Sequence, residues 1–267
     1  MSVNTLPAQQ FSSQSDAMSS RIDGITRCTR YACGPNRLQL CGPDMHHEVI
    51  AYLAAGASDG GLAQILRGFQ TLYPYLENIA HANHIRDPFH TRIVEAYWIG
   101  NELLDAITPR AYFRHITDIR QLRRTPSNSH AFDTLAEKLR HGATMHHNFH
   151  VMNVWQRTGY VQEAHTLNSM DQCRVSWGTV TKIDGPYLTL KRQPLATAGG
   201  KLLLGPEETV KIIRRLNDAS FVDDLRAGDV ISLHWDVPCD IVDARELRNL
   251  KKYTALALSL ANITVLS

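Results

Sequence analysis

The sequence predicts an α+β protein, in which an N-terminal all-α helical domain precedes a small β-barrel and a C-terminal helix. Two observations support this. Apolar residues recur at helical spacing from Ile25 to about His165, whereas short alternating segments separated by glycine turns follow Cys173. The 267 residues suffice for two modest domains with hydrophobic cores. We therefore divide the chain into a disordered tail (1–22), a helical domain (23–166) and the barrel with its helix (167–267).

The composition limits which classes of partner and location are expected. A net charge of +2 gives no global field for nucleic acid or a membrane surface, so neither is expected as a partner. No apolar run approaches the roughly 18 residues that span a bilayer. The start, residues 1–20, is rich in Ser and Gln and lacks the apolar core of a signal peptide. Five cysteines, an odd number, then predict a cytoplasmic protein with free thiols.

The helices of the first domain are predicted from their end signals. Asp44 is placed as an N-cap, with Glu48 in the first turns of its helix. Proline after a capping residue marks two further starts, and glycine marks a stop. The expected helices are one ending at Ala55, one from Gly60 to His81 broken before Pro74, one from Asp87-Pro88 to Ile107, one from Thr108-Pro109, and Phe132 to Arg140 stopped by Gly142.

The last third is predicted to begin with a strand opened by Cys173. Turns at Asp184-Gly185, Gly199-Gly200 and Gly228-Asp229 separate the strands, and His234 lies in the last of them. A capped helix then starts near Asp243. With these features the segment resembles the HypC/HupF family of hydrogenase-maturation chaperones, which implies a HypC-like (OB-type) barrel.

The same resemblance implies that Cys173 and His234 take up an iron fragment for a metalloenzyme partner. The family's cysteine stands at the very start of the chain, whereas Cys173 follows a domain of about 165 residues. A thiolate needs access and a lowered pKa to act as a ligand. The alternative is that Cys173 is simply a packed apolar residue at the start of a strand.

Polar residues gather around two Cys-Gly-Pro triplets, which continue into Asn36 and into Asp44-Met45-His46. A carboxylate beside a tight turn can act as a general base, although the dipole of a following helix lowers its basicity. The alternative for Asp44 is a purely structural N-cap. Cys33 and Cys41 match zinc-site spacing poorly.

A second cluster, Met145-His146-His147-Asn148-Phe149-His150, holds three histidines in five residues. Imidazoles can ligate a metal or move protons. We favour a polar pocket without metal, and keep a site made by His146, His147 and His150 as the alternative. No Glu-x-x-His pair of the di-iron type is found in the helical segments.

The third cluster is Glu95-Ala-Tyr-Trp98-Ile-Gly-Asn101-Glu102. Its glutamates and its tryptophan lie beside the apolar stripe of a predicted helix. A cationic amine could bind between carboxylates and the face of the indole. Ordinary surface charge is the alternative.

Taken together, these three clusters and the HypC-like end resemble a bacterial family that includes aziridine-forming proteins of azinomycin-type natural-product pathways. That resemblance implies base-assisted intramolecular displacement of sulfate from an amino-acid-derived amine, with a sulfotransferase as partner protein. Such ring closure needs a base, enforced orientation and charge stabilisation. The sequence has no GxGxxG, P-loop, HExxH or GxSxG motif, so no cofactor is expected.

Two function hypotheses follow. The first is a cofactor-independent ring-closing enzyme; the second is a non-catalytic HypC-like accessory protein for hydrogenase maturation. The residues assigned to the enzyme are, as catalytic groups, Asp44, His46, His147 and His150, and, as groups that bind the small amine, Glu95, Trp98, Asn101, Glu102, Asn36 and Asn148. Those assigned to the accessory protein are Cys173 and His234.

Overall fold

The structure is a computed structural model that describes residues 22–119, 129–154, 158–161, 164–216, 219–222 and 224–263. The predicted tail lies outside these ranges except for Ile22. Within the described ranges, no helix has both the length and the apolar character needed to cross a membrane.

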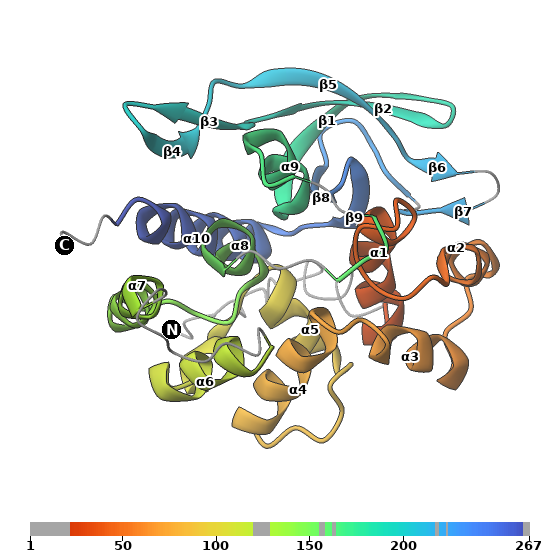
Figure 1. Ribbon diagram of the computed structural model, residues 1–267. Helices are drawn as coiled ribbons and strands as arrows, with labels where there is room; N and C mark the ends of the chain where they lie inside the picture. The colour runs from red at the N-terminus through yellow and green to blue at the C-terminus, as the bar shows by residue number, and fades with distance from the viewer. Residues whose placement is uncertain are drawn as a thin grey trace, which may run out of the picture.

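Helices make up the body of the molecule and a sheet covers one side of it (Figure 1). The helices are α1 (Gly24–Asn36), α2 (His46–Ala55), α3 (Gly60–Arg67), α4 (Leu72–Ala82), α5 (Thr91–Trp98), the 3-10 helix η2 (Glu102–Ala106), α6 (Pro109–Ile119), α7 (Ser129–Arg140), α8 (His147–Phe149), the π-helix η4 (His150–Val154), α9 (Leu167–Cys173) and α10 (Ala244–Ala261).

Several predicted helix ends are confirmed. The helix expected to end at Ala55 does so, and Gly56 follows it in the left-handed region. Helix α6 begins at Pro109, and α7 ends at Arg140 before Gly142. Helix α10 starts after Asp243, whose carboxylate accepts from the backbone of Glu246 while Glu246 caps in return.

Other predicted ends are corrected. The N-cap of α2 is Met45, not Asp44, and no side chain caps this helix. The break expected before Pro74 is present, at residues 68–71, and Pro74 itself stands in the first turn of α4, where a missing N–H costs nothing. The helix expected from Asp87 to Ile107 is two pieces, α5 and η2, separated around Gly100 with φ +95°.

Five strands form one antiparallel sheet in the order β5-β2-β1-β8-β9. Two short hairpins, β3-β4 and β6-β7, extend from it. The strands are β1 (Ser176–Asp184), β2 (Tyr187–Arg192), β3 (Leu195–Ala198), β4 (Lys201–Leu204), β5 (Glu208–Ile213), β6 (Arg215–Leu216), β7 (Ala219–Ser220), β8 (Val230–His234) and β9 (Val237–Ile241).

The predicted turns lie where expected, with Gly185, Gly199 and Gly228 at positive φ. The start of the sheet differs from the prediction, because Cys173 is the last residue of α9 and β1 begins at Ser176. Closure of the sheet into an OB-type barrel remains a prediction.

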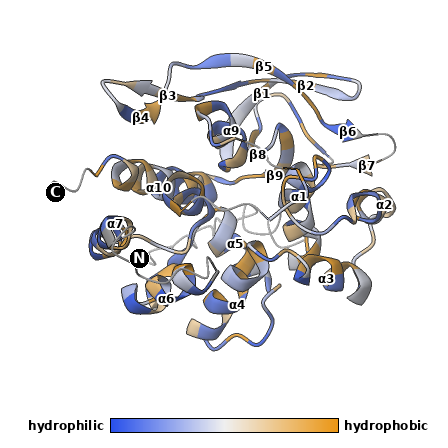
Figure 2. Cartoon of the chain, viewed as in Figure 1, coloured by the Kyte–Doolittle hydropathy of each residue, from blue (hydrophilic) through white to orange (hydrophobic). Residues whose placement is uncertain are grey.

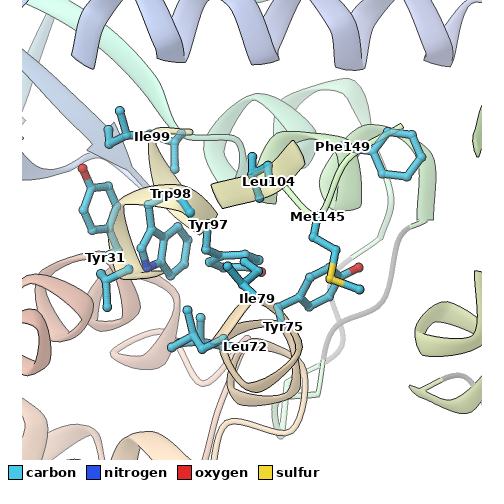
Figure 3. Packing of buried hydrophobic residues seen from close by; sticks show 14 of the residues in the cluster. Tyr31, Leu72, Tyr75, Ile79, Tyr97, Trp98, Ile99, Leu104, Met145 and Phe149 are labelled. Carbon is cyan, nitrogen blue, oxygen red and sulfur yellow. The ribbon is translucent and has the colours of Figure 1, made fainter. Parts of the chain in front are cut away.

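One buried apolar cluster extends across the predicted boundary at 166/167. It contains residues of α1, α4 and α5 together with Val175, Leu250 and Tyr253. Aromatic rings run through it, with Trp98 between Tyr31 and Tyr97 (Figure 3). Helices α4, α6, α7 and α10 each carry hydrophilic and hydrophobic residues, as expected of amphipathic helices around a shared core (Figure 2).

Buried charges also tie the two parts together. Arg27 of α1 lies 2.7 Å from Asp240 of β9, 2.7 Å from Glu246 of α10 and 3.6 Å from Glu95 of α5. Arg245 is a second cation that pairs with Glu95, at 2.7 Å. Burial alone would lower the pKa of Arg27, but the neighbouring Asp240 and Glu246 carboxylates raise it, so the guanidinium stays charged.

Candidate metal centre

Three side chains that can ligate a metal converge between the helices and the sheet. His147 comes from α8, Cys173 from the end of α9 and His234 from the end of β8. One ligand atom of each, a ring nitrogen or Sγ, lies within 4.8 Å of the other two. Both histidines are buried and Cys173 is half-buried.

Helix α9 fixes the position of Cys173. Thr166 and Ser169 form a capping box at its start. At its end, Asp171 pairs with Arg174 at 3.0 Å and with Arg192 of β2 at 2.7 Å. The guanidinium of Arg174 is paired with the Asp171 carboxylate, so its charge is not directed at the thiol of Cys173.

A tight hairpin fixes His234. Trp235 and Asp236, at φ 53° and 54°, form the two-residue turn between β8 and β9, a conformation unusual for a bulky residue. The Trp235 N–H donates to Gln172 O at 2.7 Å, which anchors the turn to α9. His234 Nδ1 lies 2.7 Å from the carbonyl of Tyr31. A carbonyl only accepts, so Nδ1 carries the proton and Nε2 the lone pair of the neutral ring.

His147 has partners at both ring nitrogens. Its Nε2 lies 2.8 Å from Cys173 O and therefore donates, which leaves Nδ1 to accept from the Tyr97 hydroxyl at 3.1 Å. Burial, and then nearby His234, lower the pKa of His147 well below its ordinary value. A neutral imidazole is the form that binds metals.

The three residues open on a small cavity of ≈ 40 Å³. Its walls are mostly apolar and include Phe69, Leu72, Trp98 and Trp235. Pro35 and Cys41, one from each Cys-Gly-Pro triplet, also contribute. Such a volume exceeds the roughly 10–15 Å³ that a water needs, so a metal held here has space for a small additional ligand.

Of the predicted site residues, the cavity brings together Trp98, His147, His150, Cys173 and His234. His150 Nδ1 lies 2.9 Å from the Tyr75 hydroxyl. His146 is separate: its Nδ1 accepts the N–H of Asn148, and its ring stacks on Tyr253. Among the described residues, the three-residue group that could hold a metal includes His147 but neither His146 nor His150.

Asp44 and His46 do not line this cavity. The Asp44 side chain is 53% exposed; it accepts from Gln39 at 3.2 Å and lies 3.3 Å from His46 Nδ1. Asn36 donates to the carbonyls of Cys41 and Pro43 and so shapes the loop between the triplets.

The residues expected to bind an amine are engaged within the protein. Glu95 pairs with Arg245 and Arg27, and Asn101 donates to it. Glu102 is exposed and forms an ion pair with Arg92. A cationic ligand would have to displace these internal cations.

Asn148 is buried and holds β1 to α8. It donates to the carbonyl of Val175 at 2.9 Å and to Thr254, and its own carbonyl accepts the Val175 N–H at 2.7 Å. This amide therefore satisfies the backbone of Val175, two residues after Cys173, and a role in binding substrate would require breaking those bonds.

Comparisons with known proteins place the chain in a family. A family model matches residues 20–267, which include all of the residues that the structure describes. The chain belongs to that family, which is described as a family of unknown function (DUF6390). Comparison with curated proteins and with solved structures gave no match. The family spans the helical body and the sheet together, so it includes all three residues of the candidate centre.

Tyr97, Cys41 and Trp235 also line the cavity, although none of them was predicted as a site residue. The repeated Cys-Gly-Pro triplet was a usable signal for Cys41. Nothing in the sequence marks Tyr97 or Trp235, because their role depends on how α5 and the β8-β9 turn pack against α8.

Proposed function

We propose that this protein binds a transition-metal ion, or a small metal-containing fragment, through His147, Cys173 and His234, and serves as an accessory protein that supplies it to a metalloenzyme. The observation that carries the proposal is the convergence of one thiol and two imidazoles within 4.8 Å. Two of the three are the residues for which the HypC/HupF resemblance implies this role.

The donor set suits the proposal. One sulfur and two nitrogen donors favour zinc, iron, nickel or copper over magnesium or calcium. Three protein ligands leave a coordination position open, whereas structural zinc sites are usually closed by four. An incomplete shell beside a cavity suits a cargo that must leave again.

The surroundings hold the ligands in place. The Tyr31 carbonyl orients His234, and the Cys173 carbonyl orients His147. Such contacts to the second ring nitrogen are usual for metal-binding histidines. His147 would exchange its hydrogen bond from Tyr97 for the metal if it coordinates through Nδ1.

The cysteines differ in burial, and this difference favours Cys173 as the metal ligand. Burial raises the pKa of both Cys28 and Cys33 to about 12, so these thiols stay protonated. Cys173 is half-buried and faces the cavity. Of the cavity's thiols, Cys41 is outside the three-residue group and so makes a matched control.

The test is metal analysis of protein loaded anaerobically with Fe(II), Zn(II) or Ni(II) and then desalted. One equivalent of one metal is expected in the wild type, and His147→Ala, Cys173→Ala and His234→Ala should each lose at least about 10-fold in affinity. Cys41→Ser should retain metal. Equal retention by Cys173→Ala and wild type, with both proteins folded by circular dichroism, would contradict the proposal.

The ring-closing enzyme makes a different prediction. Asp44→Asn should abolish sulfate release from an amine sulfate ester while leaving metal content unchanged. The half-exposed position of Asp44, away from the cavity, is why we favour the metal-carrying role. Neighbouring hydrogenase genes would support the accessory protein, whereas neighbouring sulfotransferase and peptide-synthetase genes would support the enzyme.

A further inference from the structure

A second cavity, of ≈ 340 Å³, lies between α6, α7 and η4. Its walls include the apolar side chains of Ile116, Phe132, Leu135 and Val154. It shares no lining residue with the candidate metal centre. This cavity is much larger than the one beside Cys173 and needs a separate explanation.

Lys138 extends into this cavity although the residue is only 9% exposed. Its ammonium donates to Asn153 Oδ1 at 3.0 Å. The amide of Asn153 is oriented by its own Nδ2, which donates to the carbonyl of Ala257. Lys138 therefore meets an oxygen that is neutral, and the Asn153 NH2 group is already used.

Among the described residues, no carboxylate forms an ion pair with Lys138. Glu137, its neighbour on α7, pairs with Arg140 and His141 instead. Burial accordingly lowers the pKa of Lys138. A buried cation without a counter-ion is costly, and removal of its charge or arrival of an anion relieves that cost.

We propose that this cavity binds a small monocarboxylate with an apolar tail, whose carboxylate pairs with the Lys138 ammonium. The tail packs along Ile116, Phe132, Leu135 and Val154, which lie with Lys138 in the same cavity. Ligand sites of this kind are mostly apolar, with a few polar groups that fix orientation. His130 and Ala131, both exposed, form the rim.

The single cationic donor argues for a carboxylate over a phosphate. A phosphate dianion requires several donors, commonly an arginine fork or a row of backbone N–H groups. Here the described polar groups of the cavity are Lys138, the already engaged Asn153, Thr134 and the rim His130. One ammonium matches one carboxylate, and the remaining wall matches a hydrocarbon chain.

The experiment uses the full chain and sodium octanoate as the probe. Binding is measured by isothermal calorimetry for the wild type, Lys138→Met and Lys201→Met; Lys201 is an exposed lysine on β4 and serves as the matched control. Octanol and inorganic phosphate are the comparison ligands. Lys138→Met keeps most of the apolar stem of the side chain and removes the ammonium, together with its hydrogen bond to Asn153.

Octanoate should bind the wild type and Lys201→Met equally, and Lys138→Met about 10–100-fold more weakly, as loss of a charge-assisted hydrogen bond implies. Octanol should bind all three proteins weakly and alike. Equal octanoate affinity in Lys138→Met, tighter binding of phosphate than of octanoate, or no octanoate binding at millimolar concentration would overturn the proposal.

A measurement on the wild type covers the case in which Lys138→Met does not fold. The ε-CH2 resonance of Lys138 is followed by NMR through a pH titration, with and without octanoate. Pairing with a carboxylate stabilises the ammonium, so octanoate should raise the pKa of Lys138. An unchanged pKa at a saturating octanoate concentration would overturn the proposal. Metal retention should not depend on octanoate, so either proposal can fail without the other.

Discussion

Arg27 offers the sharpest test of how the helices and the sheet are joined. Its side chain is 4% exposed and lies among the carboxylates of Glu95, Asp240 and Glu246, whose side chains are 9%, 12% and 1% exposed. Arg27→Met keeps most of the apolar stem and removes the charge. Arg245 would then be the cation left to this group, and it contacts mainly Glu95.

The expected cost follows from that burial. Removing one partner of a buried ion pair typically destabilises by about 3–5 kcal/mol, because the other charge is left uncompensated. Here the closest carboxylates, those of Asp240 and Glu246, both lie 2.7 Å from the guanidinium. We therefore expect Arg27→Met to lose about 3–5 kcal/mol, a large part of the ~5–15 kcal/mol that stabilises a typical domain.

The loss should depend on pH in a defined direction. Burial already raises the pKa of Glu246 even with Arg27 present. Without Arg27, which lowers the pKa of Glu246, that pKa lies still further above its unfolded value. A carboxyl of this kind binds more protons folded than unfolded, so stability increases as pH falls through the folded pKa. The deficit of Arg27→Met should thus be largest at neutral pH and smaller at pH 5.

Urea unfolding followed by circular dichroism at both pH values measures this. Arg92→Met is the control, because Arg92 pairs with Glu102 at the surface, where both side chains are more than half exposed. Its cost should be about 0–1 kcal/mol. The reasoning is refuted if Arg27→Met costs no more than Arg92→Met, or if its deficit is the same at pH 7 and pH 5.

Three further substitutions test the surroundings of the candidate centre. Gly34→Ala would place a Cβ 2.5 Å from the carbonyl oxygen of His234, so it should lower both stability, measured by urea unfolding, and metal retention. Gly60→Ala is the control, because its Cβ would have no atom within 4 Å, and it should change neither. Asn148→Leu leaves two buried backbone groups without partners, so urea unfolding should show a loss of about 2–5 kcal/mol. Tyr97→Phe removes the competitor for His147 Nδ1 and should tighten metal binding about 2–10-fold; weaker binding would indicate coordination through Nε2.

Much of the fold could be predicted because its signals are local. The start of α10 is encoded by Asp243 and by Glu246 three residues later, and the structure contains both halves of that capping box. The β1-β2 and β3-β4 hairpin turns contain glycines at positive φ. The start of α6 at Pro109 is likewise a property of the residue itself, since proline suits the first turn of a helix.

One error arises where contacts between elements decide the outcome, and another where two local signals compete. Asp44 resembles an N-cap, yet its carboxylate contacts Gln39 and His46 and the helix starts beside it without a side-chain cap. Cys173 precedes an apolar strand pattern, yet the capping box at Thr166 starts a helix that runs through it. That box was a local signal, and it would have moved the start of the sheet to its observed place.

The candidate site was predicted residue by residue but not as a unit. His147, Cys173 and His234 were each singled out, His147 for the enzyme and the other two for the accessory protein. Their association depends on α8 meeting the end of α9, where the Cys173 carbonyl accepts from His147. That contact joins segments far apart in the sequence, and no periodicity or turn signal specifies it.

The origin of the third ligand bears on what the helical body is for. Cys173 and His234 lie at the ends of α9 and β8, in the C-terminal part of the chain, whereas His147 comes from the preceding helical part and reaches them across the shared core. Gly34 allows α1 to approach His234, and Tyr31 of the same helix orients its ring. A two-residue site would hold a metal loosely. Because the helical part supplies His147, Tyr31 and Gly34, the metal affinity of the proposed site depends on the packing of α1 and α8 against the sheet. Under the proposed carrier function, a partner contact that shifts these helices would weaken the site and release the metal at the moment of transfer.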